Sequence, residues 1–559
     1  MNIKDLYKYE PKKDYKFTLE PQKLKEDKTA PTSNQKKSES EEHQDQKQIY
    51  TSIEQNLTYL KTTYNTLINS DIILREFSLT SKNKIYKAFL VYIDGMVNSD
   101  LVNNYVLNPL MLRNQNNTYE GILNLRNVET AKKIKNTNLT DYIYGNLMPQ
   151  NSVDKETEFS KIISGINAGN CALFVDTINT AFNIEVKGFK QRNVDVPRNE
   201  LVIKGPQEAF VENIRTNTTL LRRLANNENL VIESIYVGEV SRTNCAVCYM
   251  ANIANSDLVA EVKYRLSNLS IDTLISSGQL EQLIENNGNH GLPQILSTER
   301  PDKCVKSLMQ GRIVILINGN PYALIMPAVL IDFLASPEDS NLKPLFANFL
   351  KCIRFLAMFI TLLLPGMYIA ITSFHHELLP TELLFSIMVA RESVPFPIIV
   401  ELLLMEISFE LIREGGLRVP SAIGSTLGIV GALILGEAAV TANIVSPILI
   451  IVVAITGLAS FAIPDYTFGF HLRVYRFIFI ILGFTAGFLG IGLGLFVYIC
   501  LLGSIKSFGV PYTTPVSPNG SSFGHRYMVL PFWKEEYRES YLSPKKQKSQ
   551  NKISMKWKQ

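Results

Sequence analysis

Apolar residues are distributed very unevenly along this chain of 559 residues, and that distribution limits the possible folds more than any other feature. Residues 344–506 are dominated by Leu, Ile, Phe, Val, Ala and Gly. A membrane-spanning helix needs about 20 apolar residues, because each residue adds about 1.5 Å and the hydrocarbon core is about 30 Å thick. We therefore predict a helical membrane domain here. Apolar runs of sufficient length lie near residues 350–373, 421–441, 446–463 and 477–504.

The remainder of the chain divides by composition. Residues 1–50 are rich in Lys, Glu, Gln and Ser and have almost no aliphatic clusters, which predicts a disordered polar tail. Residues 51–343 have the composition of a soluble α/β protein. We expect two α/β subdomains there, 51–195 and 196–343, the second with linking helices. Residues 507–559 form a C-terminal segment whose Lys-rich tail suits the surface of anionic membrane lipids.

An internal repeat organises the soluble region. The stretch VYIDGMVNSDLV (91–102) aligns without a gap with CYMANIANSDLV (248–259). The pattern of each copy predicts a buried strand, then Asn-Ser-Asp, then a helix. The polar side chains can accept hydrogen bonds from the free N–H groups of the first helical turn. Downstream, GNCALFVDTINTAF (169–182) matches GRIVILINGNPYAL (311–324), and both have the pattern of a β-hairpin. The predicted fold class is thus a duplicated α/β soluble N-terminal region followed by an α-helical multi-span membrane domain.

Few residues in the soluble region have the spacing of a catalytic or metal-binding site. Cys245 and Cys248 form a C-x-x-C motif within a strand-like stretch, where residues three apart point to opposite faces. We therefore expect buried thiols there and not a metal or redox pair. The sequence shows no nucleophile elbow or phosphate-binding loop, so we expect no enzymatic activity, metal or cofactor. The net charge of +4 is too small to indicate nucleic acid binding.

One loop of the second copy, STERPDK at residues 297–303, gathers charged side chains around a proline. Glu299, Arg300 and Asp302 are its three candidate residues. Two interpretations fit this pattern: an ion-pair cluster between domains, or a signalling contact.

An apolar segment of the membrane domain, residues 381–416, carries too many charges for a lipid-exposed helix, and Pro395 and Pro397 interrupt it. Irregular, charged backbone at membrane depth is tolerated only where protein or water surrounds it. We therefore predict a broken or re-entrant element. Its charged residues are Arg391, Glu392, Glu401, Glu406, Glu410 and Arg413.

The arginines that flank the spans give conflicting orientations under the positive-inside rule. The rule places the arginines within 413–418, those within 473–476 and the Lys-rich tail all on the cytoplasmic side. A single crossing at 477–504 would instead put the tail on the side opposite to residues 473–476. Two solutions are open: the charged segment does not cross, or the Gly-rich stretch 483–496 folds back as a hairpin. We expect both termini to be cytoplasmic, because charged residues interrupt any apolar core of an N-terminal secretion signal.

The stretch GIVGALILGEAAV, residues 428–440, places a glutamate, Glu437, in a helix apolar enough for a membrane. An ionised carboxylate in hydrocarbon costs several kcal/mol, so such a residue indicates a functional site. Successive residues of a helix are rotated by about 100°, which groups two sets of side chains on different faces. One face holds Thr426, Val430, Leu433, Glu437 and Thr441, and a ridge of small residues that allows close helix packing holds Gly424, Gly428, Ala432 and Gly436.

Several copies of the first face around an axis would line a pore. Glu437 would form an acidic ring that attracts cations, and Val430 and Leu433 would form a constriction that closes by dewetting. The sequence leaves two alternatives open. Glu437 lies about one turn from the end of the run, so it could reach the interface or pair with an arginine. The helix could equally pack inside a transporter-like bundle.

Long ordered motifs in this chain resemble the A subunit of GerA-family spore germination receptors. The resemblance covers roughly residues 70 to 533. It rests on ELVIKGPQEAFVENIRTNTTLLRR (200–223), STERPDKCVKSLMQGRIVILINGNPYALIMP (297–327), the segment 375–424 that begins HHELLPTELLF, GIVGALILGEAAVTANIVSP (428–447) and FGVPYTTPVSP (508–518).

The resemblance implies a nutrient germinant receptor in the inner membrane of a bacterial endospore, with a transporter-like B subunit and a lipoprotein C subunit as partners. It also implies a homo-oligomer that forms a nutrient-gated cation channel, with membrane lipids around it. A non-conducting scaffold that holds the nutrient-binding partner is the alternative. In the channel interpretation, Arg391, Glu401, Glu406, Glu410 and Arg413 are candidates for ion pairs that rearrange on opening.

Overall fold

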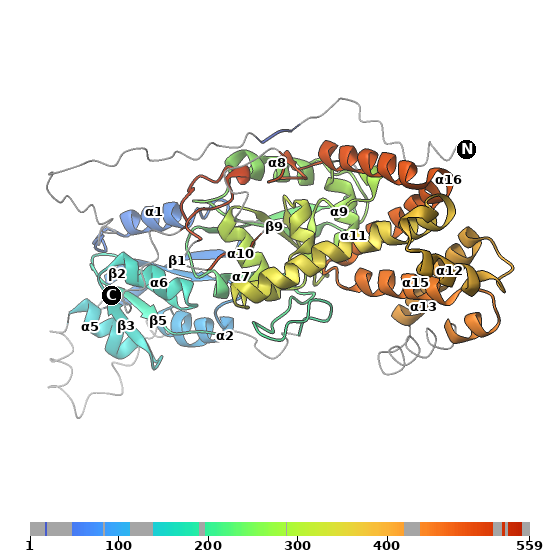
Figure 1. The fold of residues 1–559 in the computed structure, drawn as a ribbon. Coiled ribbons are helices and arrows are strands. Elements are labelled where there is room, and N and C mark those ends of the chain that lie inside the picture. Colours follow the sequence, from blue (N-terminus) through green and yellow to red (C-terminus); the bar gives the residue numbers. More distant parts are fainter. Residues whose placement is uncertain are drawn as a thin grey trace, which may run out of the picture.

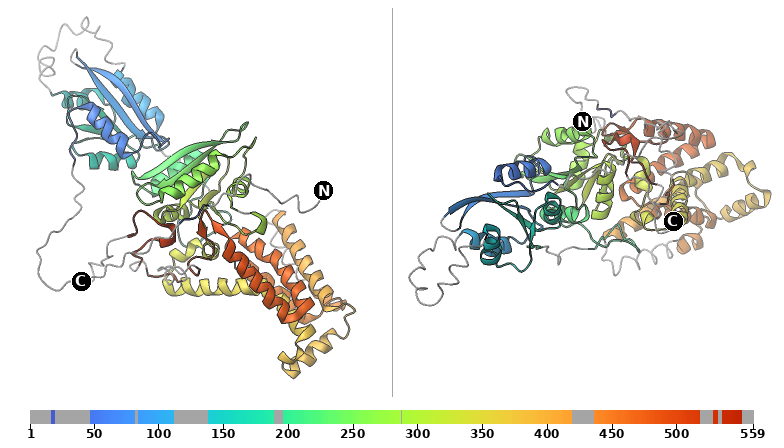
Figure 2. Two further views of the ribbon diagram at one scale, coloured as in Figure 1. Left: turned by 90° about the horizontal axis from the view of Figure 1, so that it is seen from above. Right: turned by 90° about the vertical axis from the view of Figure 1, so that its left-hand side faces the viewer.

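Two α/β units and a helical region follow one another along the molecule (Figures 1 and 2). In this computed structural model, nine segments of the chain are described. They are residues 17–19, 47–81, 84–111, 138–188, 196–286, 288–418, 436–517, 528–531 and 535–549.

The first unit is built on a five-stranded antiparallel sheet with the strand order β1-β2-β4-β5-β3. Its strands are β1 (Ile72–Ser81), β2 (Lys84–Ile93), β3 (Val153–Glu156), β4 (Cys171–Val175) and β5 (Ala181–Ile184). Its helices are α1 (Ile53–Thr63), α2 (Ser99–Leu101), η2 (Val102–Leu107), α3 (Asn108–Met111), α5 (Leu139–Tyr142), η4 (Ile143–Leu147) and α6 (Phe159–Asn167).

The second unit repeats this topology with a second antiparallel sheet, ordered β6-β7-β9-β10-β8. Its strands are β6 (Leu230–Val237), β7 (Thr243–Met250), β8 (Leu296–Thr298), β9 (Ile313–Ile317) and β10 (Ala323–Met326). Its helices are α7 (Ile214–Leu224), α8 (Ser256–Ser267), α9 (Ser277–Ile284), η6 (Gly288–His290), α10 (Pro301–Gln310), η7 (Leu330–Leu334) and η8 (Pro337–Ser340). The predicted hairpins are β4 with β5 in the first sheet and β9 with β10 in the second.

The capping asparagines of the repeat have equivalent roles. The Oδ1 atom of Asn98 accepts a hydrogen bond from the backbone N–H of Asp100 at 2.9 Å. Asn255 accepts one in the same way from Asp257 at 2.8 Å. Each asparagine satisfies an N–H group of the first helical turn, which has no partner within the helix. The predicted order of strand, polar cap and helix is therefore present in both copies.

Cys245 and Cys248 of β7 lie on opposite faces of the second sheet, as the alternation of side chains predicts. Cys245 packs with Leu258 of α8, whereas Cys248 packs with Leu308 of α10. Both are free, buried thiols, and burial raises the pKa of Cys245 to about 12. The expectation of two buried thiols is thus confirmed.

A buried ion pair joins the two α/β units. Arg222 of α7 donates through Nε and Nη2 to the two carboxylate oxygens of Asp71, each at 2.8 Å, and both side chains are 2% exposed. Beside this pair, the N–H of Ser70 donates to the carbonyl of Ile232, and the N–H of Ile232 donates to Asn69. The start of β1 is therefore hydrogen-bonded to the start of β6, and the two sheets meet at this edge.

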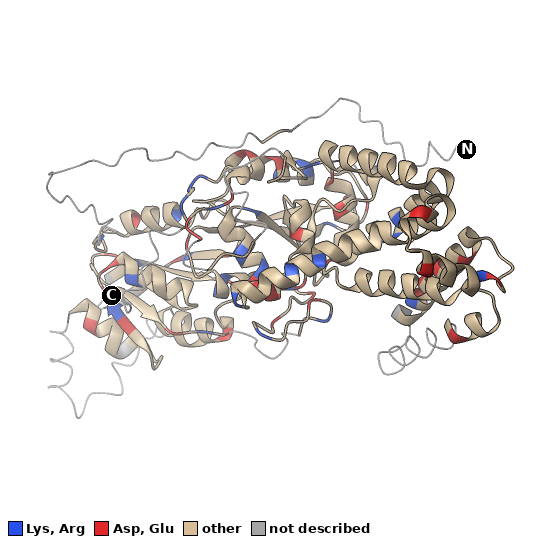
Figure 3. Cartoon of the chain, viewed as in Figure 1, with Lys and Arg blue, Asp and Glu red and all other residues tan. Residues whose placement is uncertain are grey.

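The helical region contains two helices that are long and apolar enough to cross a membrane, α11 (Pro344–Phe374) and α16 (Tyr466–Ser504), within the part of the chain that the structure describes. Between them lie η9 (His376–Leu378), α12 (Thr381–Arg391), α13 (Ile398–Arg418) and the shorter apolar α15 (Pro447–Phe461). Charged side chains are sparse on α11 beyond its beginning (Figure 3). The segment with Pro395 and Pro397 is broken between α12 and α13, as predicted for a broken element. The predicted run at 421–441 falls largely outside the described residues.

The helix α16 folds back on itself at Gly487. This glycine has φ 56° and ψ −138°, which are not helical values. His471 Nε2 lies 3.2 Å from the hydroxyl oxygen of Tyr498, although 27 residues of straight helix would separate them by about 40 Å. A Cβ atom at Gly487 would lie 2.7 Å from Cε1 of His375, so only glycine fits this turn. Of the two predicted topologies, the structure has the hairpin, and both ends of α16 face the α/β units.

The chain after α16 returns to the second α/β unit. A short hairpin, β11 (Lys506–Ser507) with β12 (Val510–Pro511), is followed by η11 (Ser540–Leu542), whose Leu542 is fully buried. Lys545 donates through Nζ to the carbonyl of Ala251. This described part of the C-terminal tail therefore contacts protein, and a lipid-facing Lys-rich end stays a prediction.

Within the predicted N-terminal tail, residues 17–19 also contact protein. Leu19 is 5% exposed and its N–H donates to the carbonyl of Gly509. The prediction of a disordered tail is therefore wrong for residues 17–19 and 47–50. Phe17 and Leu19 pack in the core of the second unit, and Ile49, which is 4% exposed, packs in the core of the first.

Candidate functional site

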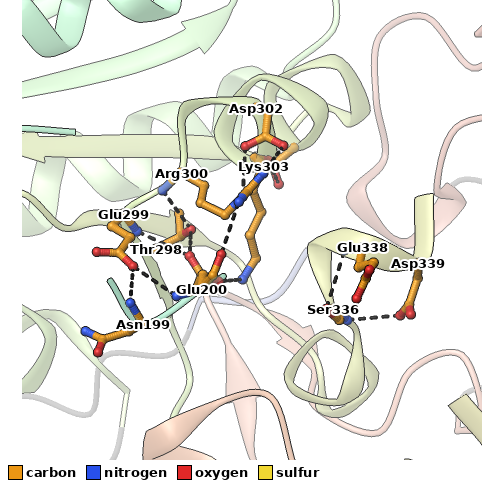
Figure 4. A network of polar contacts seen from close by, with 11 residues as sticks. Asn199, Glu200, Thr298, Glu299, Arg300, Asp302, Lys303, Ser336, Glu338 and Asp339 are labelled. Carbon is orange, nitrogen blue, oxygen red and sulfur yellow. Dashed lines mark hydrogen bonds and ion pairs between the residues drawn. The ribbon is translucent and has the colours of Figure 1, made fainter. Parts of the chain in front are cut away.

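The loop STERPDK forms a polar network that fixes the segment before α7 to the start of α10 (Figure 4). Arg300 is fully buried, with 0% exposure. Its guanidinium donates to the carbonyl oxygens of Glu200 and Pro206 at 3.1 and 2.9 Å, and to both carboxylate oxygens of Asp302 at 3.1 and 2.9 Å. Four hydrogen bonds thus offset the cost of burying this charge.

Two further carboxylates complete this network, which we call the Arg300 network. The Oε1 atom of Glu299 accepts hydrogen bonds from the backbone N–H groups of Asn199 at 2.6 Å and Glu200 at 2.9 Å. The carboxylate of Glu200 binds Lys303 Nζ at 2.6 Å and the hydroxyl group of Thr298. The sequence pointed to Glu299, Arg300 and Asp302 but missed Glu200 and Lys303. The signal for Glu200 was weak, because it lies 100 residues away from its partners.

A second anchor fixes α11 to the α/β region. The Nη1 atom of Arg354 lies 2.8 and 2.6 Å from the two carboxylate oxygens of Asp339 in η8. The N–H of Ser336 donates to Asp339 Oδ2 at 3.0 Å, which holds that carboxylate in place (Figure 4). Twenty residues of α11, Phe355 to Phe374, follow this anchor. Their length of about 30 Å equals the thickness of a hydrocarbon core.

Two carboxylates at the junction with α16 have strongly altered acidity. Burial raises the pKa of Glu281 to about 8, and the negative charges of Glu285 and Asp465 add to this effect. Burial also raises the pKa of Glu285 to about 7, which a hydrogen bond from the N–H of Gln294 opposes. Asp465 caps the first turn of α16 through a hydrogen bond from Phe468. Protonation of these groups therefore depends on pH near neutrality, where α9 meets the beginning of α16.

A cluster of five charged residues joins α13 to the first arm of α16, and we call it the helical charge cluster. Glu406 lies 2.8 Å from Arg476, and both side chains are at most 1% exposed. Glu410 contacts Arg413 and Arg473 at 3.3 Å each and Arg476 at 3.0 Å. Arg413 also donates to the hydroxyl oxygen of Ser460 in α15 at 2.6 Å.

The helical charge cluster is not balanced internally, because it holds three arginines and two glutamates. The Nε and Nη1 atoms of Arg476 are buried and have no hydrogen-bond partner within the described part of the chain. Removing one member of a buried ion pair usually costs about 3 to 5 kcal/mol, because the other charge is left without compensation. The sequence identified Glu406, Glu410 and Arg413, whereas it used the two α16 arginines only to orient the span.

The remaining predicted charge pair lies at the other end of α13. Arg391 Nη2 lies 3.1 Å from Glu401 Oε1, and Glu401 is fully buried. The other oxygen of Glu401 accepts a hydrogen bond from the N–H of Ser446 at 3.2 Å. The break between α12 and α13 is thus held to the start of α15. The structure therefore separates the five predicted gating residues into two groups, one at the start of α13 and one along its middle.

The predicted stripe around Glu437 lies only partly within the described residues. Residues 436–441 are helical, and Glu437 and Thr441, one turn apart, are both exposed. Gly436 is half-buried, and a Cβ atom there would lie 3.9 Å from Ile450 of α15. The other stripe positions fall outside the described residues, so their roles stay predictions. They are Gly424, Thr426, Gly428, Val430, Ala432 and Leu433.

Most of the chain is similar in sequence to known spore germination proteins. The family model described as Bacillus/Clostridium GerA spore germination protein matches residues 58–541. Spore germination protein KA of Bacillus subtilis (strain 168) is 36% identical over 485 residues, which cover 87% of this chain and 86% of that protein. Spore germination protein A1 of the same strain is 42% identical over 360 residues, or 64% of this chain and 74% of that protein.

One solved structure is similar in sequence to about half of this chain. The crystal structure of the N-terminal domain of the A subunit of the Bacillus megaterium spore germinant receptor GerK3 is 30% identical in sequence, with a TM-score of 0.37. The match covers 51% of this chain and 98% of the crystallised chain. The family model matches most of this chain, and the alignments cover most of each curated relative. This chain therefore belongs to the GerA family of spore germination proteins.

Proposed function

We propose that this chain is the A subunit of a nutrient germinant receptor in the inner membrane of the bacterial endospore. It works with a transporter-like B subunit and a lipoprotein C subunit, and its α/β units lie on the cytoplasmic side. Copies of the chain assemble around an axis into a cation channel that opens when nutrient is sensed. Membership of the GerA family supports the receptor role. The helical charge cluster is the observation that carries the channel mechanism.

The helical charge cluster has the properties of an element with two stable arrangements. Arg476 already contacts Glu406 and Glu410, which lie one turn apart on α13. A small shift of α13 along α16 would exchange these partners without leaving a carboxylate uncompensated, since the cluster has a surplus of positive charge. Packed interfaces that switch between such discrete arrangements are a common basis of gating.

The contacts between the α/β region and the helices support coupling to this cluster. Asp339 holds α11 through Arg354, and Tyr475 of α16 donates from its hydroxyl group to the carbonyl of His290 at 3.3 Å. A movement of the second α/β unit would therefore act directly on both long helices. Helix α13 contacts α16 through Glu406 and α15 through Arg413, and Gly436 lies beside Ile450 of α15. A shift of α13 would therefore change the position of Glu437 and so the pore.

Glu437 supports the pore in a second way. In the single chain its carboxylate is exposed and forms no ion pair with a described residue. An unpaired carboxylate at membrane depth is costly unless it faces water. A central aqueous path, lined by the same residue from each copy, would supply that water and attract cations.

The decisive experiment is nutrient-triggered potassium release from spores that carry Glu437→Gln, with receptor level measured in the same spores. Loss of the acidic ring lowers the local cation concentration, so we expect release to slow by about tenfold at normal receptor level. The matched control is Glu382→Gln, which neutralises an exposed glutamate at the start of α12. That control variant should release potassium like the unaltered receptor.

Two other outcomes would favour the non-conducting scaffold. Release that is unchanged by Glu437→Gln would remove this carboxylate from the conduction path. Loss of the receptor complex from Glu437→Gln spores, with the control complex intact, would make it an assembly residue. Cysteine crosslinking at Thr441 separates these cases, because a face that surrounds an axis gives a ladder of crosslinked copies.

A further inference from the structure

A cavity of about 330 Å³ lies where α11 ends, at the part of the helical region farthest from the α/β units (Figure 1). Three of its lining residues, Leu384, Ile387 and Arg391, recur at spacings of three and four residues and so form one face of α12. The end of α11 and the turn that follows form the opposite wall. The lining residues are Thr372, His376, Leu379, Leu384, Ile387, Met388, Arg391 and Glu392.

We propose that this cavity binds the headgroup of an ethanolamine phospholipid, with the phosphate on Arg391 and the ammonium on Glu392. The apolar wall formed by Leu384, Ile387 and Met388 then contacts the first part of an acyl chain. This site is distinct from the helical charge cluster and from the predicted stripe. It rests on the membrane placement proposed above.

The position of the cavity along α11 is the reason for proposing a lipid as its ligand. The anchor at Arg354 ties the first part of α11 to the α/β region, and the 20 residues that follow it span about 30 Å. Thr372, in the cavity wall, is therefore at the level of the opposite lipid headgroups. The apolar side chains of α12 open outward at the same level, since Met388 is 59% exposed and Val389 is 69% exposed.

Arg391 is prepared for a phosphate. Its Nη2 atom is held by the buried carboxylate of Glu401, which fixes the guanidinium plane. Its Nε atom is buried and has no hydrogen-bond partner among the described residues. A guanidinium has five N–H donors in a planar fork that matches the geometry of phosphate oxygens. The Arg391 side chain is 28% exposed, so the accessible donors that Glu401 leaves unused can bind a phosphate.

Glu392 supplies the opposite charge. It is the C-cap residue of α12, it is exposed, and its carboxylate makes no ion pair with any described residue. A negative charge at a helix C-terminus is unfavourable, because the carbonyl ends of the helix already carry partial negative charge. A primary ammonium would offset both the charge of the Glu392 carboxylate and the partial negative charge at the end of α12. A choline headgroup has no N–H donors and so cannot make the same hydrogen bonds.

The test uses the full-length chain in liposomes and an ethanolamine phospholipid that carries a photoreactive diazirine near the headgroup. After illumination, we expect the crosslink to map to peptides within residues 372–392. Unlabelled ethanolamine phospholipid should compete about tenfold better than choline or glycerol phospholipid, the factor expected for one ion pair of about 1.4 kcal/mol. Glu392→Gln should abolish that preference, whereas Glu382→Gln, on the same helix but outside the cavity lining, should retain it.

Several results would overturn the assignment. Equal competition by all three phospholipids would mean non-selective surrounding lipid only. Equal competition by soluble phosphoethanolamine would mean a site for a free small zwitterion and not for a lipid. Ile387→Trp, which fills the cavity, keeps the test informative if Glu392→Gln is poorly expressed, since it should reduce the crosslink. Flotation with the liposomes is measured first, because failure to float would refute the membrane placement and not the site itself.

Discussion

The Arg300 network and the helical charge cluster are both built from arginines and carboxylates, but they differ in how fully the charges are satisfied. Arg300 makes four hydrogen bonds, two to backbone carbonyls that cannot change their charge. Arg476 has one hydrogen bond and two buried N–H positions without a partner among the described residues. The first arrangement fixes a loop in one position, whereas the second leaves room for exchange of partners. Similar residues therefore serve as a static clamp in one region and as a candidate switch in another.

The largest effect should come from breaking the clamp. We expect Arg300→Met to lower the free energy of unfolding by about 3 to 5 kcal/mol, because Asp302 loses its partner and the carbonyl groups of Glu200 and Pro206 lose their donor. Pulse proteolysis of the full chain in urea measures this loss. Arg300→Lys should recover only part of it, since one ammonium cannot reach all four acceptors. A loss below about 1 kcal/mol for Arg300→Met would contradict the role of a clamp.

The surplus of positive charge in the helical charge cluster predicts that removing a carboxylate destabilises the protein more than removing an arginine. Glu410→Gln raises the surplus of positive charge from one to two and should cost about 3 kcal/mol in the same assay. Arg473→Gln removes the surplus and should cost about 1 kcal/mol or less. Arg473→Gln spores should also show a changed nutrient threshold for potassium release, because the set of exchangeable partners is smaller. Equal destabilisation by the two variants would refute the surplus.

A third effect depends on pH and concerns the junction between the two regions. The pKa of Glu281, about 8, lies above the ordinary value near 4.5, so the folded protein holds a proton that the unfolded chain releases. Stability is therefore fully present below about pH 4.5 and is lost as the pH rises towards 8, by about 1 kcal/mol per pH unit. Urea midpoints measured between pH 5 and pH 8 give this slope. Glu281→Gln should reduce the slope, and an unchanged slope would assign it to other groups.

Local patterns in the sequence predicted much of the α/β region. The caps at Asn98 and Asn255 and the opposite faces of Cys245 and Cys248 depend on neighbouring residues alone, so a pattern of a few residues is sufficient. The partnership of Glu200 with Lys303 was not predictable in this way. It joins segments 103 residues apart, and no local pattern indicates which of many carboxylates a lysine meets.

The helical region shows the same limit. The sequence indicated that Gly483 to Phe496 was a possible turn, but the choice between a hairpin and a straight helix needed the contact of His471 with Tyr498. Arg473 and Arg476 looked like markers of membrane orientation, and the structure places them against Glu410. From the sequence, each charge was used only to orient its own helix. The ion pairs that the charges form depend on which helices pack together.

The sequence by itself determined the division into soluble and apolar regions, the duplicated unit and the break at Pro395 and Pro397. Each of these follows from composition, periodicity or backbone chemistry, which act over a few residues. The tertiary structure alone decided the turn at Gly487, the position of residues 535–549 against the second sheet and the membership of the two charge networks. The reason is physical: ion pairs and close helix crossings gain their free energy from partners distant in the chain, and only packing selects those partners.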